Sequence, residues 1–460
     1  MSGRGKPALV AVTWPLFAEL LLATLVGMAG LTLSARLSEA AAGAYALSNH
    51  VQAALFLLYR IVAMGASVVI TQQLGAGDRR GADETARAAI GASTWLGAGA
   101  GLAVLLGAGA FLALLNAPAD VLAIGAPYLR TLALALALDA FNASMAAVMR
   151  AHLHGRDTLI NMISMHALHL LLCGPLMRWL GLPGFAVAMA ISRAFGLALH
   201  LWLWQRRLAL VPRGRDWWQL RGRRLAPVLH IGLPGAAENV AWRLAFMVTV
   251  SFAAAMGVAE LATHSVTIQI QTFVLLFSLA IGFATEILVG HLVGAGRLHE
   301  ADRHVRRSLR WGIGVSAVTA LAAALAAPWL LPLITRDPKV VEAATTLLWI
   351  AVLLEPGRVF NLVVINALRA TGDARFPVGA GAISMVVVMA GGAWLLGVHF
   401  GLGLPGLWLA YTADEWVRGL TMMTRWNRRG WLPHARATQR RVLARRRRAA
   451  GGDPGPTTIG

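Results

Sequence analysis

The chain has 460 residues, of which 57% are hydrophobic and only 13% are charged, and its formal net charge is +20. Soluble domains carry about 25% charged residues, so this composition excludes an ordinary soluble protein and indicates one that lies mostly within a membrane. The single cysteine, Cys173, excludes an intrachain disulfide and a zinc site made of cysteines, and we expect it to be a small buried hydrophobe.

Apolar runs of about 20 residues can cross the hydrocarbon core of a bilayer, and the chain contains twelve of them. They cover roughly residues 8–35, 44–75, 86–114, 121–149, 158–180, 184–208, 227–256, 263–293, 307–334, 341–369, 377–399 and 404–427. Too few residues precede the first run for a signal peptide, so we expect that run to be a retained span. The sequence thus predicts an all-α polytopic membrane protein with twelve transmembrane helices.

An Arg-rich polar stretch from Gln205 to Arg224 separates the first six runs from the last six. It carries Trp217 and Trp218, which we expect at the membrane interface. After Arg425 the chain becomes basic and then rich in Gly and Pro, which is typical of a segment without a fixed fold. We therefore predict four parts: a six-helix lobe at 1–208, a cytoplasmic basic linker at 209–226, a second six-helix lobe at 227–427 and a basic disordered tail at 428–460.

Uncommon residues recur between the two halves at a constant offset of 219 positions. The matches are Pro15 with Pro234, Glu19 with Glu238, Gly75-Ala76-Gly77 with Gly294-Ala295-Gly296, Asn142 with Asn361, Arg150 with Arg369, and Arg156 with Arg375. This register predicts two pseudo-symmetric six-helix lobes, an architecture common among secondary transporters. Each Gly-Ala-Gly stop lies where the end of a helix favours a left-handed residue. The matched prolines predict either hinges or fixed bends.

Positive charge gathers in alternate loops: 31 of the Lys and Arg residues fall in one set, 5 fall in the other, and five more lie inside spans. Because cytoplasmic loops carry such an excess, both termini are predicted to be cytoplasmic. The Ala- and Arg-rich composition suits a bacterial genome, so we expect a location in the bacterial inner membrane. Topology and attraction to anionic lipid explain the charge, so we expect membrane lipids as partners and no nucleic acid.

Acidic residues inside spans are costly and usually face a cavity or a partner. Side chains at i±3 or i±4 share a helix face. By this spacing Arg358 pairs with Glu355, and Arg418 pairs with Asp414 and Glu415. We interpret these as intramembrane ion pairs with a mainly structural role.

Glu19, Asp139 and Glu238 have no basic residue at those spacings. A carboxyl group without a partner in a medium of low dielectric binds a proton readily, so we predict that these three carry the coupling proton or cation. Glu355 is the alternative coupling residue. Pairing across helices is the structural alternative, and the candidate partners are Arg60, Arg193 and Arg243.

Aromatic and polar side chains supply the candidates for a substrate cavity: Trp14, Trp242, Phe246, His50, Gln269, Asn142 and Asn361. An aromatic ring beside an acid suits an amphipathic cation, and packing is the alternative role. His166 and His169 share a helix face, but no third ligand lies near them in sequence, so we expect cavity lining or packing and no metal. The sequence has no P-loop, nucleotide fingerprint or nucleophile constellation, so we expect no cofactor and no enzyme activity.

The chain resembles the multidrug and toxic compound extrusion (MATE) family at several of these landmarks. The stretches are Gly65-Ala66-Ser67 leading to Gln73-Leu74-Gly75-Ala76-Gly77-Asp78, then Leu233-Pro234-Gly235-Ala236-Ala237-Glu238, Val289-Gly290-His291-Leu292-Val293-Gly294-Ala295-Gly296, and Leu368-Arg369-Ala370-Thr371-Gly372-Asp373-Ala374-Arg375-Phe376-Pro377. The resemblance extends over residues 8–427 and implies a V-shaped fold of two lobes. It also implies export of amphipathic or cationic organic molecules in exchange for H⁺ or Na⁺ by alternating access, and we expect a monomer.

Two positions depart from the family pattern. Family members often have an aspartate near the position of Met28-Ala29-Gly30, and a glutamate about one turn after Glu238, where Trp242 and Arg243 stand. Glu238 is thus expected to act from one turn away, or else the substrate and coupling ion differ. The alternative functions are a related flippase or exporter of lipid-linked or amphipathic metabolites and, from another class, a polytopic membrane enzyme or receptor.

Overall fold

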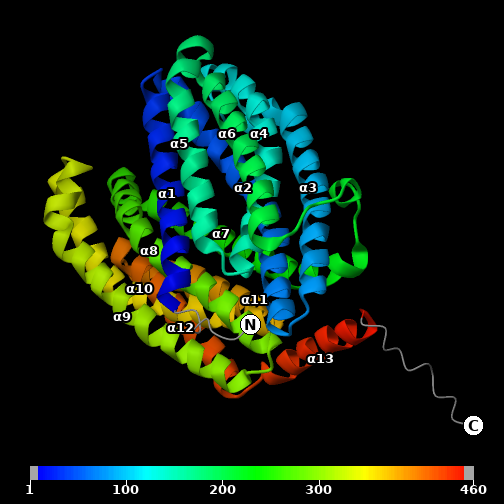
Figure 1. The fold of residues 1–460 in the computed structure, drawn as a ribbon. Helices are drawn as coiled ribbons and strands as arrows, with labels where there is room; N and C mark the ends of the chain where they lie inside the picture. Colours follow the sequence, from blue (N-terminus) through cyan, green and yellow to red (C-terminus); the bar gives the residue numbers. More distant parts are fainter. Residues whose placement is uncertain (1–8, 450–460) are drawn as a thin grey trace, which may run out of the picture. The chain divides into compact units, whose positions relative to one another are not determined.

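The structure, a computed structural model, describes residues 9–449, with side-chain positions as far as residue 444. This range contains helices and no strand (Figure 1). The helices are α1 (Leu9–Ala35), α2 (Glu39–Gly75), α3 (Arg79–Leu114), α4 (Ala119–Ala151), α5 (Gly155–Leu180), α6 (Leu182–Leu203), α7 (Gly222–Met256), α8 (Val258–Gly294), α9 (Leu298–Leu330), α10 (Pro338–Thr371), α11 (Arg375–Ser384), α12 (Gly403–Asn427) and α13 (Leu432–Ala449). Short 3-10 or π-helical segments are η1 (Trp204–Leu208), η2 (Gly214–Trp217), η3 (Leu331–Leu333), η4 (Met385–Ala390) and η5 (Ala393–His399).

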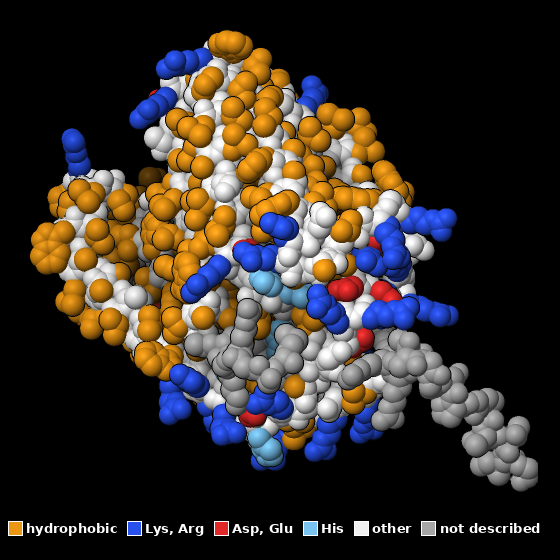
Figure 2. Space-filling model, in the orientation of Figure 1, with side chains coloured by type: hydrophobic (Ala, Val, Ile, Leu, Met, Phe, Trp, Pro, Cys, Tyr) orange, Lys and Arg blue, Asp and Glu red, His pale blue; other side chains and the backbone are white. Residues whose placement is uncertain are grey.

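Within residues 9–449, eleven helical segments are long and apolar enough to cross a membrane. One of them runs from α11 through the π-helical turns of η4 and η5 and ends at His399. The twelfth span is α12, whose apolar sequence is interrupted by Asp414, Glu415 and Arg418. Figure 2 shows hydrophobic side chains over much of the face in view, with Lys and Arg side chains more frequent in its lower half. The predicted all-α fold with twelve spans is confirmed.

The 219-residue repeat is present in the backbone itself. Helices α2 and α8 begin and end at matched positions, and α3 and α4 begin at positions matched by the first residues of α9 and α10. Gly77 and Gly296 both adopt φ of 73°, the left-handed conformation expected after each helix end. Leu153 and Gly372, another matched pair, have φ of 65° and 94°. The two halves therefore share turn geometry even where their residues differ.

The chain divides into two compact units. The first comprises residues 18–74 and 78–236, and the second comprises residues 237–449 together with residues 9–17 and 75–77. The division falls inside α7, after Ala236, and not at the predicted linker. The reason is that the start of α7 packs into the first unit: Val228 and Ile231 are buried in its core, and a Cβ on Gly232 would meet the backbone oxygen of Ile61.

The predicted linker is folded onto the first unit. Asp216 in η2 is buried and forms ion pairs with Arg87 of α3 (3.6 Å) and Arg221 (2.5 Å). Trp217 packs on Phe141, with 5.4 Å between ring centroids. These contacts involve α3 and α4, so the segment is ordered and packs against these two helices.

The prediction of a disordered tail at 428–460 was wrong for residues 432–449, which form α13. These residues form an amphipathic helix with one apolar stripe, since Ala435 and Val442 are buried while Arg436 and Arg440 are exposed. The Thr438 hydroxyl donates to the carbonyl oxygen of Thr371 at the end of α10 (3.4 Å). The predictions for residues 1–8 and 450–460 lie outside the described residues.

Candidate functional site

Charged side chains in the first unit pair across helices. Asp139 of α4 lies 2.7 Å from the Arg193 guanidinium of α6, and both side chains are about nine-tenths buried. The Asn142 amide donates to the backbone oxygen of Arg193 (3.1 Å), and its own oxygen lies 3.1 Å from His200 Nδ1. Asp139 is therefore a paired acid, and Arg193, the partner named as the structural alternative, is confirmed.

Glu19 of α1 is also paired, with a residue just beyond the predicted span 121–149. Arg150 Nη1 donates to Glu19 Oε2 over 2.9 Å, and the Thr158 hydroxyl donates to Glu19 Oε1. Arg150 lies in the last turn of α4, and its long side chain reaches α1 from there. The interpretation of Glu19 as an isolated carboxyl group is therefore wrong.

The second unit contains the repeat-related pair. Arg369, in the last turn of α10, donates to Glu238 of α7, and its other terminal nitrogen donates to Asn366 Oδ1 (3.3 Å). Both members of the pair are buried. Since Glu19 and Arg150 match Glu238 and Arg369 at the offset of 219, the same ion pair was retained in both halves.

Five charged side chains gather between α10 and α12, and we name this group the α10–α12 charge cluster. Arg358 lies 2.6 Å from Glu355 and 3.4 Å from Glu415. Arg418 lies 2.7 Å from Asp414 and 3.0 Å from Glu415. The ion pairs predicted from i+3 and i+4 spacing are confirmed, and Glu415 joins them into one network.

Neutral side chains complete this cluster. Gln271 donates to Glu355 Oε1 (2.9 Å), Asn361 donates to Glu415 Oε2 (2.9 Å), and Ser384 donates to Asp414 Oδ1 (2.7 Å). Glu355 is fully buried, and its Oε2 has no hydrogen-bond partner among the described residues. The cluster thus holds three carboxyl groups against two guanidinium groups, with one carboxyl oxygen left unbonded.

The two halves differ in the sign of the charge that α4 and α10 carry at a matched position. Position 139 of the first half matches position 358 of the second, so an acid on α4 corresponds to a base on α10. The partner is reversed as well, because Arg193 on α6 pairs with Asp139 while Glu415 on α12 pairs with Arg358. The sign of the charge is therefore reversed at this one matched position, while the two partners lie at unmatched positions, since Arg193 matches Thr412.

An aromatic cluster lies between α7, α8 and α12. The rings of Trp242 and Phe246 stack with centroids 5.2 Å apart, and Phe246 approaches Tyr411 (6.2 Å) and His264 (6.1 Å). The Trp408 indole donates to His264 Nδ1 (3.2 Å), which leaves Nε2 to carry the ring proton, buried and without a partner in the described structure. Trp242 and Phe246 were predicted from the sequence but the other three residues were not, because spacing along one helix carries no signal for contacts made by its neighbours.

The remaining candidates are dispersed. Trp14, His50 and Gln269 are exposed on their own units. His166 and His169 are buried, and none of their four ring nitrogens has a hydrogen-bond partner among the described residues. No group of three His, Cys, Asp or Glu side chains in the described part of the chain could hold a metal ion.

These observations define a class. A duplicated set of six membrane-crossing helices, with ionisable side chains paired inside each set, is the architecture of a secondary membrane transporter.

Comparison with known proteins specifies the class further. The profile of the MatE family matches residues 15–174 and again residues 234–395, so the two matches begin at the repeat-related prolines. The chain belongs to the MatE family, whose members are transporters and not enzymes.

The relatives agree with this assignment. The chain is 30% identical over 441 residues to the "Uncharacterized transporter YisQ" of Bacillus subtilis, covering 93% of this chain and 96% of the relative. It is 23% identical to the "Probable multidrug resistance protein NorM" of Thermotoga maritima, covering 95% of each. A solved structure of a MATE protein in the bent conformation has a TM-score of 0.85 at 19% identity, covering 94% of this chain and 97% of that one, which confirms the fold.

Proposed function

We propose that this protein is a secondary active exporter that exchanges amphipathic organic cations for H⁺ or Na⁺ by alternating access. Relatives from several bacteria carry the name of multidrug resistance proteins, which supports a drug-like substrate class. The bacterial relatives also support a location in the inner membrane. The charge pattern of the loops supports cytoplasmic termini.

The coupling ion binds at the α10–α12 charge cluster, with Glu355 as the residue that takes it up. The observation that carries this proposal is the surplus of one carboxyl group, together with the unbonded, buried Oε2 of Glu355. A buried carboxylate without compensation is costly, so a proton or a sodium ion on that oxygen would neutralise the cluster. The salt bridges of Glu19, Asp139 and Glu238 each join one carboxyl group to one guanidinium group and leave no such surplus.

The organic cation binds near the aromatic cluster of the second unit. Trp242, Phe246 and Tyr411 offer flat π-faces, which attract a cation most strongly where water is excluded. Trp242 and Phe246 are only partly buried, so their rings retain surface for a ligand.

Transport of a fluorescent organic cation into proteoliposomes tests the proposal under an imposed pH gradient and, separately, a sodium gradient. Glu355→Gln preserves shape but cannot titrate, so it should still bind the cation while losing gradient-driven transport. Glu355→Asp keeps a titrating group and should retain part of the activity. The matched control is Glu342→Gln, an exposed acid on the same helix, which should leave transport unchanged.

Two results would contradict the proposal. Gradient-driven transport at the wild-type rate by Glu355→Gln would show that Glu355 does not couple the ion gradient to transport. If the folded wild-type protein transports nothing under either gradient, the proposed antiport is contradicted.

A further inference from the structure

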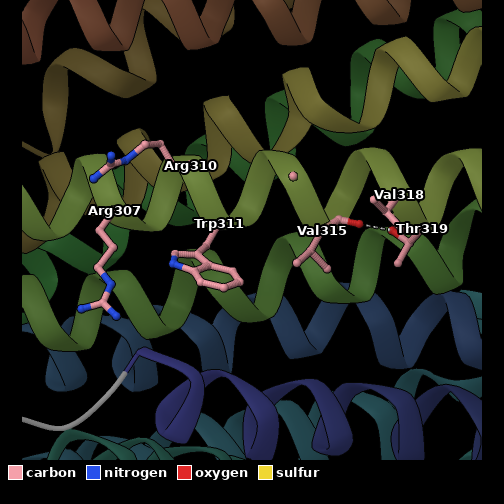
Figure 3. A pocket seen from close by; sticks show the side chains of 7 residues that line it. Arg307, Arg310, Trp311, Val315, Val318 and Thr319 are labelled. Carbon is pink, nitrogen blue, oxygen red and sulfur yellow. Dashed lines mark hydrogen bonds between the residues drawn. The ribbon is translucent and has the colours of Figure 1, made fainter.

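One exposed face of α9 forms a groove of about 670 Å³. Its lining residues are Arg307, Arg310, Trp311, Gly314, Val315, Val318 and Thr319 (Figure 3). Their spacing of three and four residues makes one stripe along the helix. Figure 3 shows the two arginines and Trp311 at one end of the stripe and Val315, Val318 and Thr319 at the other. The groove is therefore cationic at one end and apolar along its length.

The two arginines of this groove are electrostatically uncompensated. The described structure records no hydrogen bond or ion pair for Arg307 or Arg310, and both side chains are exposed. Their neighbour Arg306, which lies off the stripe, forms an ion pair with Asp302 (3.1 Å) and donates a hydrogen bond to Asn427 Oδ1 (2.9 Å). Two free cations beside an exposed tryptophan (59% exposed) form an anion-binding edge at the end of a membrane span.

The matching face of the first half is covered by the chain itself. Arg310 and Gly314 correspond to Gly91 and Trp95 of α3 at the offset of 219. Gly91 is buried against the backbone oxygen of Gln219, and the Trp95 indole donates to the backbone oxygen of Trp218 (2.9 Å). The linker segment that follows α6 thus occupies this face on α3, whereas on α9, within residues 9–449, the groove at the same face is lined by residues of α9 and carries arginine.

We propose that the α9 groove binds an anionic phospholipid, with the phosphate on Arg307 and Arg310 and an acyl chain along Gly314, Val315 and Val318. Charge complementarity selects an anionic headgroup, and an ammonium-bearing zwitterion matches two unpaired cations less well. The apolar stripe, with Val318 67% exposed, requires an occupant that also has a hydrocarbon part. An inorganic anion would fill only the cationic end of the groove.

Native mass spectrometry of the full-length protein tests this with phosphatidylglycerol and phosphatidylcholine as probes. The wild type should retain phosphatidylglycerol in preference to phosphatidylcholine. The double variant Arg307→Gln with Arg310→Gln should lower the affinity for phosphatidylglycerol about tenfold. Val318→Trp should lower it to the same extent, because the larger side chain blocks the apolar part of the groove while both arginines stay in place. Arg306→Gln removes one positive charge from the same helix outside the groove and should have no effect.

Several results would overturn the proposal. Equal retention of phosphatidylglycerol by the wild type and the double variant would show that the two arginines do not contribute to lipid binding. Full competition by inorganic phosphate, with Val318→Trp unaffected, would reduce the groove to a simple anion site. A wild-type dimer that the double variant converts to a monomer would make this face an interface between two copies of the chain.

Discussion

At the scale of single residues, the molecule compensates most of its buried charge by reaching across helices. The Glu19–Arg150 and Glu238–Arg369 pairs join the first helix of each half to the end of its fourth. Each pair lies inside its own unit and joins two helices of that unit.

Arg369→Gln should lower stability strongly, because it leaves Glu238 buried and uncompensated. Breaking a buried pair in this way costs about 3–5 kcal/mol. The melting temperature in detergent should fall, and the double variant Glu238→Gln with Arg369→Gln should recover most of it. Arg80→Gln is the control, since that side chain is 73% exposed and its ion pair contributes about 0–1 kcal/mol. A double variant less stable than Arg369→Gln alone would contradict the argument.

Trp242→Leu should weaken binding of aromatic cations. The stacked pair of Trp242 and Phe246 offers an aromatic face, and losing a cation–π contact of about 1 kcal/mol corresponds to roughly a fivefold rise in KM. Transport assays should show a similar change for a tetraalkylammonium ion of the same charge, because a quaternary ammonium group also binds aromatic faces by cation–π attraction. Trp179→Leu, at an 87% exposed position, is the matched control. An unchanged KM for both substrate types would show that this aromatic cluster does not bind the organic cation.

At the scale of helices, close packing in the first unit depends on glycine where α2 crosses α7. A Cβ on Gly65 would collide with the backbone of Val228, and one on Gly232 would collide with Ile61. Small residues let membrane helices approach this closely. The crossing explains why the first turns of α7 belong to the first unit.

Gly65→Val should therefore destabilise the first unit, because overpacking against backbone costs about 1–3 kcal/mol. Gly99→Val tests the same substitution on α3, where nothing lies within 4 Å of an added Cβ. Thermal unfolding should separate the two variants, with Gly99→Val close to the wild type. Equal melting temperatures for all three proteins would show that the helices separate here without cost.

The sequence predicted the elements better than it predicted the side-chain partners. Apolar length alone located twelve spans, because the bilayer sets helix length. Arg150 lies just beyond the predicted span 121–149 and Arg369 is the last residue of the span 341–369, and a hydropathy pattern does not reveal that a side chain of a final helical turn contacts another helix. The same reasoning missed Arg150 and Arg369 as partners and missed His264, since i±3 and i±4 spacing describes one helix at a time. Helix α13 was missed because its many arginines dominate the composition and conceal a narrow apolar stripe.

At the scale of the whole molecule, the duplicated architecture fixes a topology that can be measured. Reporter fusions after Gly257 and Asp337 should read as extracytoplasmic, and fusions after Arg221 and Gly296 as cytoplasmic. These positions lie in short connections or at helix starts, so a fusion interrupts no span. An inverted reading at any one of the four positions would contradict the assignment of six spans to each half.

The arithmetic of the α10–α12 charge cluster has a consequence for energetics. In the proposed coupling, one surplus carboxyl group takes up one monovalent ion, so an exchange for one monovalent organic cation would be electroneutral. Moving a net charge across a membrane potential of 100 mV is worth about 2.3 kcal/mol, and an electroneutral cycle gains none of it. Such a transporter would draw its driving force from the concentration gradient of the ion alone. Dissipating the voltage should leave its steady-state accumulation ratio unchanged, whereas a divalent substrate would make the same protein voltage-sensitive.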